Sequence, residues 1–138
     1  MSNNPTTRNT LEQGRAQHAF KAAELSKDLD RYASYAKKLP MMIKTNGLGA
    51  ALAFAFSKKE AAWKKLYDDV ESWLREDPKM LISIENYRGS FLEILVNVED
   101  SRTYRALTTE VLAYLSWLRR FSEGFNQKQK ESHNERTN

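Results

Sequence analysis

Residues 39–54 read Leu-Pro-Met-Met-Ile-Lys-Thr-Asn-Gly-Leu-Gly-Ala-Ala-Leu-Ala-Phe and hold the most information about the fold. Proline suits the first turn of a helix and pushes the residue before it out of the helical region. Leu39-Pro40 therefore predicts the end of one helix and the start of a short new one. Asn46 and Gly47 tolerate left-handed backbone angles and predict a break. The small, apolar residues that follow predict another helix, one able to pack closely against a neighbour.

The same region is segregated in charge. From Arg31 through Lys59 there are six Lys or Arg residues and no Asp or Glu. The whole chain has a formal net charge of only +4, so the distribution is more informative than the total. A block of positive charge in a chain whose total charge is nearly balanced predicts a surface that binds an anion. A phosphate backbone is an anion that could extend over such a surface.

Length and composition limit the architecture. A chain of 138 residues is expected to form one domain around a single core. The absence of cysteine excludes disulfides, thiolate metal sites and a cysteine nucleophile. Residues 1–9 are polar, so we expect no signal peptide. The longest apolar run, residues 48–56, is about half of the roughly 20 residues that a transmembrane helix needs. We expect a cytoplasmic protein that does not contact membranes.

Helical periodicity covers most of the chain. The first helix is predicted to open at the capping box Thr10-x-x-Gln13, to keep one helical stripe from Leu11 to Ala36, and to end at Leu39-Pro40. Residues 80–88 fit a strand by propensity, or a short helix or loop because no partner strand is evident. Further helices are predicted to begin at the capping signals Ser57, Ser90, and Asp100 or Ser101.

The two ends of the chain differ from its middle. Residues 1–9 and 126–138 are rich in polar side chains and lack aliphatic anchors, so both are predicted to be disordered tails. Residues 10–125 form the predicted helical domain. The fold prediction is all-α, a single compact domain of five or six helices with disordered polar tails.

Three segments resemble a known family. They are Leu11-Glu12-x-x-Arg15-Ala16; Leu39-Pro40-x-x-Ile43-x-x-Asn46-Gly47-Leu48, followed by Ala51-Leu52-Ala53-Phe54; and Tyr104-Arg105-x-x-Thr108-x-Glu110-Val111-Leu112, running into Leu115-x-Trp117-Leu118-x-Arg120-Phe121. Occurring in the expected order and spacing, they make the chain resemble the small subunit of the type III-B CRISPR RNA-targeting (Cmr) effector complex.

The resemblance implies a non-catalytic subunit of an antiviral complex, without a cofactor. Members of the family are small helical proteins that stack in several copies beside the backbone subunits that carry the guide RNA. Together they form the channel in which target RNA pairs with guide RNA, and the backbone subunits cleave the target. The implied partners are target RNA and guide RNA, the Cmr backbone and large subunits, and further copies of the chain.

Basic side chains are the candidates for RNA contact, because phosphate contacts give affinity without sequence preference. On the last helix, at about 100° per residue, four arginines fall opposite the predicted core stripe, with small residues between them. The residues of that stripe are Tyr104, Leu107, Val111, Leu115, Leu118, Phe121 and Phe125. A solvated helix face is the alternative explanation of these four arginines. The candidate residues are Arg15, Lys37, Lys38, Lys44, Lys58, Lys59, Arg102, Arg105, Arg119 and Arg120.

Several of these residues allow two interpretations. Lys58 and Lys59 are expected at a helix N-terminus, where the macrodipole disfavours positive charge, and this favours an external anion. Arg15 either pairs with an acidic side chain at the edge of the core or contacts RNA or another subunit. His18 is interpreted as a hydrogen-bonded residue near the core. The cluster of Asp68, Asp69 and Glu71 is interpreted as surface ion pairing on the exposed side of its helix, and the three tryptophans as packing residues.

Other functions are weaker predictions. A helical adaptor whose basic faces bind an acidic protein is the main alternative to the RNA-binding subunit. A DNA-binding regulator is less favoured because no helix-turn-helix spacing stands out. An enzyme is not expected, because the sequence has no pair of histidines at metal-ligand spacing, no phosphate-binding glycine loop and no Ser, His and Asp set.

Overall fold

The computed structural model describes residues 4–76 and 91–137. These residues form six helices: α1 (Asn4–Leu25), α2 (Tyr32–Asn46), α3 (Leu48–Ser57), α4 (Ala61–Glu76), α5 (Phe91–Val96) and α6 (Ser101–Thr137). Within those two ranges there is no strand, so the predicted all-α single domain is confirmed. The capping signal at Ser90 and the alternatives for residues 80–88 lie outside the described residues.

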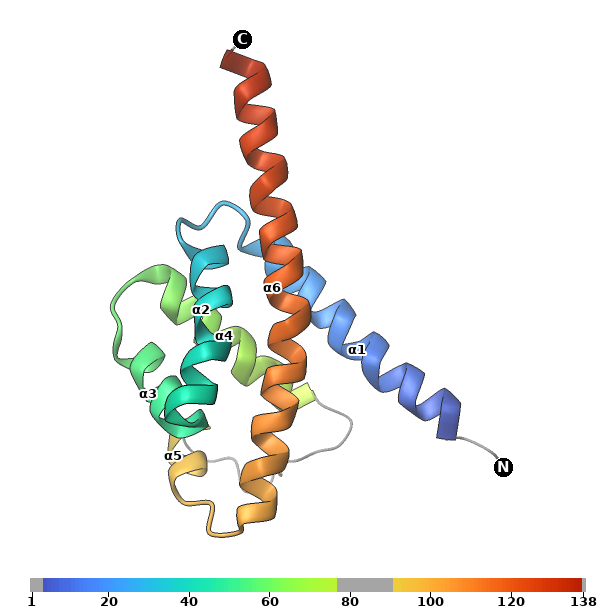
Figure 1. Cartoon of the computed structure of the whole chain (residues 1–138), viewed down its shortest axis with the longest axis vertical. Helices are drawn as coiled ribbons and strands as arrows, with labels where there is room; N and C mark the ends of the chain where they lie inside the picture. The colour runs from blue at the N-terminus through green and yellow to red at the C-terminus, as the bar shows by residue number, and fades with distance from the viewer. Residues whose placement is uncertain (1–3, 77–90, 138) are drawn as a thin grey trace.

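The long helix α6 is the axis of the molecule. It runs along the full height of the domain, and α1 crosses it while leading away toward the N-terminus (Figure 1). Helices α1 and α2 both pack against α6, and α3 and α4 pack against α2 and against each other. The short α5 packs against α3. Every helix therefore buries part of its surface in one shared core.

The core face of α6 follows the predicted stripe. Leu107, Val111, Leu115 and Leu118 are fully buried, and each such side chain contributes roughly 1.5–3 kcal/mol through burial. The other three residues of that stripe, Tyr104, Phe121 and Phe125, are partly buried and pack against the core. Trp63 and Trp73 are buried as expected, and Trp117 is partly buried.

The predicted first helix, from Thr10 to Leu39, is in fact two helices, so this prediction was wrong. The chain leaves α1 after Leu25 and forms successive turns before α2 begins at Tyr32. Arg31, which immediately precedes α2, has a left-handed backbone with φ of 70°. Residues 26–30 include one serine and two aspartates, whose short polar side chains compete with helical hydrogen bonding. Apolar residues keep their helical spacing across this break, so the sequence pattern did not indicate that the helix ends there.

Pro40 was also placed wrongly, because it lies inside α2 rather than at a helix boundary. An interior proline removes one backbone hydrogen bond and costs about 3 kcal/mol. Its neighbours Leu39 and Ile43 are 0% and 2% exposed, and their burial in the core offsets that cost. Tertiary packing thus keeps the helix intact through a local breaker.

The break predicted at Asn46 and Gly47 is confirmed. Gly47 has φ of 92° and ψ of 159°, a conformation open almost only to glycine. Its N–H donates to the Ile43 carbonyl over 2.8 Å and closes the end of α2. The same residue directly precedes α3, so one glycine separates two helices.

Two of the predicted capping signals fail and one succeeds. Thr10 lies within α1, and Ser57 ends α3, where its hydroxyl donates to the Phe54 carbonyl over 2.7 Å. Asp100 caps α6 as expected, because its carboxylate accepts a hydrogen bond of 3.0 Å from the Arg102 N–H. The capping signals therefore predicted the helix start correctly at Asp100. They failed at Thr10 and Ser57, which lie within or at the end of a helix.

The terminal helices extend into both segments predicted to be tails. Helix α1 begins at Asn4, and α6 continues to Thr137. Residues 126–137 contain no proline or glycine and are rich in Gln, Lys and Glu, which have high helix propensity. A helix already formed over the core extends through such residues without a new nucleation cost.

A candidate RNA-binding face on α2 and α6

Basic residues from two helices meet in one groove. Lys44, in the last turn of α2, lines it together with Arg119 and Arg120 of α6. The groove has a volume of about 290 Å³. The remaining side chains that line it are Pro40, Leu112, Ser116 and Glu123. The groove thus combines three cations and one carboxylate with the apolar side chains of Pro40 and Leu112.

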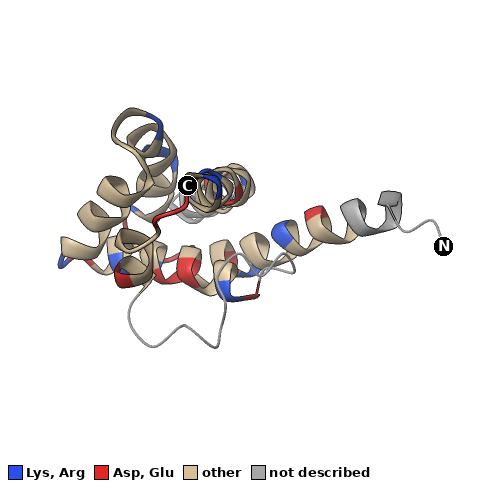
Figure 2. Cartoon of the chain, turned by 90° about the horizontal axis from the view of Figure 1, so that it is seen from below, with Lys and Arg blue, Asp and Glu red and all other residues tan. Residues whose placement is uncertain are grey.

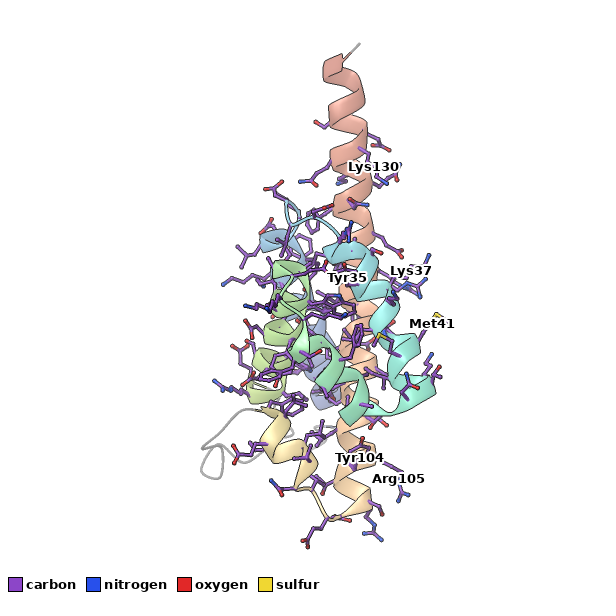
Figure 3. The ribbon with its side chains drawn as sticks, turned by 90° about the vertical axis from the view of Figure 1, so that its left-hand side faces the viewer. Tyr35, Lys37, Met41, Tyr104, Arg105 and Lys130 are labelled. Carbon is purple, nitrogen blue, oxygen red and sulfur yellow. The ribbon has the colours of Figure 1, made fainter. Side chains whose placement is uncertain are left out.

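The outer face of α2 extends this positive surface. Lys37 and Lys44 lie seven residues apart, almost two helical turns, and therefore share one face of the helix. Met41 lies between them and is 68% exposed. Lys37 and Met41 project toward the same side of the molecule as Arg105 of α6 (Figure 3). Lys38 is exposed on the neighbouring edge of α2.

The outer face of α6 supplies the arginines. Arg102, Arg105, Arg119 and Arg120 are all exposed, as the helical spacing predicted. Arg119 donates to the Glu123 carboxylate over 3.2 Å, so part of its charge is neutralised. An exposed ion pair of this kind contributes little stability and exchanges readily with another anion. We define the basic face as the following seven residues: Lys37, Lys44, Arg102, Arg105, Arg119, Arg120 and the central Met41.

The structure does not bring Lys58 and Lys59 to this groove. Both precede α4 in the short connection after α3, and Lys58 caps the C-terminus of α3. Its Nζ atom lies 4.5 Å from the centre of the Phe54 ring. A helix C-terminus and an aromatic ring both stabilise a cation. The prediction of a disfavoured helix start was therefore wrong for Lys58, and with it the argument for an external anion at that residue. Lys59 directly precedes Glu60, whose carbonyl accepts from the Lys64 N–H in the first turn of α4, so Lys59 does lie beside a helix start.

Arg15 lies apart from the basic face, in an ion pair at the edge of the core. Its Nε and Nη2 atoms donate to the two carboxylate oxygens of Glu110 over 2.6 and 2.8 Å. Glu110 is fully buried and also accepts a 2.9 Å hydrogen bond from the Trp73 indole. The side chain of Arg15 is only 17% exposed. Of the two interpretations, the pairing with an acidic side chain is the one present.

His18 is a hydrogen-bonded residue near the core, as expected. Its Nδ1 lies 2.8 Å from the Tyr114 hydroxyl, and its Nε2 lies 3.1 Å from the Ser72 hydroxyl. Burial lowers the pKa of His18, although Glu76, 3.6 Å from Nε2, acts in the opposite direction. The lowered pKa favours the neutral imidazole.

Asp69 differs from the sequence interpretation, which placed it on the exposed side of α4. It is 7% exposed and accepts a 2.5 Å hydrogen bond from the Tyr32 hydroxyl, with Lys65 as its ion-pair partner. Burial raises the pKa of Asp69, and the hydrogen bonds from Lys65 and Tyr32 oppose that rise. The carboxylate thus joins α2 to α4. Helical period alone could not show this, because the partner Tyr32 lies on another helix.

The described part of the chain has neither a metal-binding cluster nor a membrane-spanning helix. Among residues 4–76 and 91–137, no three His, Asp or Glu side chains are grouped so that they could hold a metal ion. The same residues contain no helix long and apolar enough to span a membrane. Lys and Arg positions occur on several helices rather than in one segment, which Figure 2 shows in a view from below.

Sequence reasoning missed one residue of the basic face and the helical position of one lysine outside it. Met41 was read only as part of a helix, although its spacing between Lys37 and Lys44 would have placed it on the same surface. Lys130 was assigned to a disordered tail, whereas it lies on α6. The high helix propensity of residues 126–137 was the sequence signal that would have placed Lys130 on the last helix.

Comparisons with known proteins agree with this fold. A sequence model of the family described as "CRISPR-associated protein (Cas_Cmr5)" matches residues 11–125. The chain is 33% identical over 119 residues to the CRISPR system Cmr subunit Cmr5 of Thermus thermophilus, covering 83% of this chain and 94% of that protein. A crystal structure of a CRISPR-associated Cmr5 family protein, also from Thermus thermophilus, superposes with a TM-score of 0.67. That structure is 29% identical in sequence, and the match covers 83% of this chain and 95% of that one.

These matches include all three segments on which the resemblance rested, and the resemblance is confirmed. Residues 126–138, with the last three turns of α6, lie beyond the matched region. The chain therefore belongs to the Cmr5 family, the small subunits of the CRISPR type III-B Cmr complex.

Proposed function

We propose that this protein is a non-catalytic structural subunit of a CRISPR-guided RNA-silencing complex. Copies stack beside the backbone subunits, and the basic face lines the channel for target RNA. One observation carries the proposal: Lys44 from α2 and Arg119 and Arg120 from α6 line a single groove. Membership of the Cmr5 family supplies the setting in which such a face would meet RNA.

The chemistry of the face suits a phosphate backbone. Guanidinium groups form paired hydrogen bonds with phosphate oxygens, and lysine adds a point charge. These contacts fix the position of the strand and do not read bases, so sequence selection is left to guide–target pairing. Each copy offers few contacts and binds weakly alone, whereas stacked copies present a continuous track.

Salt dependence tests this mechanism on the isolated chain. If the three cations of the groove each meet one phosphate of single-stranded RNA, log affinity falls with log salt at a slope of roughly −2 from these contacts alone. We expect this slope for several unrelated RNA sequences. Tight binding to one sequence, unaffected by salt, would exclude the mechanism.

Charge reversal in the assembled complex tests the site. The variant Arg119→Glu/Arg120→Glu is expected to leave assembly with the other Cmr subunits intact and to reduce the RNA that co-purifies with them. The matched control Lys21→Glu/Lys64→Glu changes the net charge equally at exposed positions of α1 and α4. The control is expected to retain RNA.

A helical protein adaptor is the second candidate, and exposed apolar residues favour it. Met41 is 68% exposed on α2, and Phe54 and Phe56 are 36% and 56% exposed on α3. Side chains of this kind commonly anchor protein interfaces. If the Arg119→Glu/Arg120→Glu variant loses assembly while its RNA affinity is unchanged, the adaptor function replaces the RNA-binding one.

A further inference from the structure

The C-terminal part of α6 is a feature of this chain that the family match does not include. The matched region ends at residue 125, and α6 continues to Thr137. At about 1.5 Å per residue, residues 126–137 add about 18 Å of helix. Figure 1 shows this part of α6 projecting beyond the other helices. We call residues 126–137 the α6 extension.

The composition of the α6 extension is unsuited to docking on a protein. Residues 126–132 read Asn-Gln-Lys-Gln-Lys-Glu-Ser and contain no apolar side chain. A helix that binds a protein groove usually presents apolar anchors at intervals of three and four residues. Asn, Gln, Ser and Lys are, in contrast, side chains that contact phosphates and sugars in nucleic-acid complexes. The extension therefore fits a polar, negatively charged partner.

The register of the helix aligns one lysine with the basic face. Lys130 follows Arg105 by about seven helical turns and so returns to the same side of α6. Lys128 lies about 160° away from Lys130 around the helix. Figure 3 shows Lys130, Lys37, Met41 and Arg105 in succession along the length of the molecule. Only one of the two lysines thus continues the face.

A cavity lies where the extension leaves the rest of the domain. It has a volume of about 440 Å³ and is bounded by α6 and by the connection between α1 and α2. Three cations line it: Lys27 and Arg31 from the connection, and Lys130 from α6. Asn126 and Gln129 are among its polar lining residues.

The two acids in the cavity wall are engaged. Asp28 accepts a hydrogen bond of 2.5 Å from the Gln129 side chain, and this contact holds the extension against the connection. Asp30 pairs with Arg31 over 4.0 Å. Arg31 also lies 3.8 Å from Glu60. Three cations against two acids leave the lining with a net positive charge, and Lys27 and Lys130 are both exposed.

We propose that Lys130 and Lys27, on opposite walls of this cavity, bind the sugar–phosphate backbone of RNA and continue the basic face past the matched region. The site rests on the proposed function, because it lengthens the same track. Its occupant is RNA backbone, since the lining carries net positive charge and, apart from Leu29 and a few small or buried residues, consists of polar side chains. The extension thereby adds phosphate contacts that a chain ending at residue 125 lacks.

The experiment uses the full chain and a labelled single-stranded RNA, with affinity measured between about 50 and 200 mM salt. Lys130→Gln removes one charge without lowering helix propensity appreciably. It is expected to make the slope of log affinity against log salt less negative by about 0.7, and Lys27→Gln/Lys130→Gln by about 1.4. The matched control is Lys128→Gln, which removes the same charge from the other side of the same helix and leaves the slope unchanged.

The outcomes separate this inference from the proposed function. Equal slope changes for Lys128→Gln and Lys130→Gln would mean that RNA binding responds only to the net charge of the chain, and this would overturn the site. An unchanged slope for Lys27→Gln/Lys130→Gln, with a reduced slope for Arg119→Gln/Arg120→Gln, would overturn the extension alone. If none of these variants alters RNA binding, the proposed function fails as well. If Lys130→Gln affects only self-association in sedimentation velocity, the partner is a second copy, which also overturns the proposal.

Discussion

Arg15 and Glu110, 95 residues apart in the sequence, form a two-pronged ion pair that fastens α1 to α6. The carboxylate is fully buried, and the Trp73 indole donates to one of the two oxygens that Arg15 binds. An unpaired buried charge is costly, so this pair fixes where α1 crosses α6 more than it adds net stability.

A double-mutant cycle tests that role. Arg15→Ala removes two charge-assisted hydrogen bonds from a buried carboxylate and is expected to lower the free energy of unfolding by about 3 kcal/mol. Adding Glu110→Gln removes the charge while keeping an acceptor for Trp73, so the double variant is expected to regain part of the loss. Urea unfolding measures both values. Additive losses in the double variant would show that the two side chains are not coupled.

Replacing glycine by alanine is expected to change the free energy of unfolding in opposite directions at Gly47 and at Gly124. Gly47→Ala forces a side chain into a backbone conformation that is nearly restricted to glycine, and is expected to cost about 1–3 kcal/mol. Gly124→Ala lies within α6, with nothing within 4 Å of the added Cβ, and is expected to gain about 0.5–1 kcal/mol. Thermal unfolding followed by circular dichroism reads both effects. A stabilised Gly47→Ala variant would contradict the cap geometry.

Ser122 presents a buried hydroxyl that finds no hydrogen-bond partner among the described residues. Ser122→Ala removes an unsatisfied polar group, and is expected to raise the free energy of unfolding by about 1 kcal/mol. Ser72→Ala serves as the matched comparison, because its hydroxyl lies 3.1 Å from His18 Nε2. We expect the Ser72 variant to be less stable than the parent in the same melting experiment.

The neutral His18 predicts a pH dependence. Its pKa is lowered by burial from the ordinary value of 6.5, so near that pH the unfolded chain binds more protons than the folded chain. Stability should therefore rise with pH through this window and fall on acidification. The charged groups around His18 are Glu76 and Asp69, which favour the imidazolium, and Lys65 and Lys21, which oppose it. Melting temperatures between about pH 5.5 and 7.5 should vary less for His18→Gln than for the parent. Identical profiles for the two proteins would contradict the assignment.

Lys44 and Lys59 belong to the same basic segment, residues 31–59, but lie at different places in the structure, so their substitution tests whether position or charge alone governs RNA binding. Lys44 lines the α2–α6 groove, whereas Lys59 lies in the connection before α4. Lys44→Gln is expected to reduce the salt slope of RNA binding by about 0.7, and Lys59→Gln to leave it unchanged. Equal effects would mean that RNA responds to the whole block rather than to the groove.

The sequence by itself determined the helical class, the core face of α6 and the glycine boundary between α2 and α3. These features are local: apolar residues at intervals of three and four select a buried face, and a positive φ selects glycine at Gly47. The same local logic failed at residues 26–31, where short polar side chains compete with helical hydrogen bonding. It also failed at Pro40, where the burial of Leu39 and Ile43 outweighs a helix breaker.

Only the tertiary structure decided which charges act together. Arg15 and Arg119 are both arginines within helices, yet one is held by the buried Glu110 and the other lines a groove between α2 and α6. That difference depends on how α1, α2 and α6 cross. Helix period fixes which way a side chain faces on its own helix, whereas the electrostatic partner comes from residues far away in the sequence.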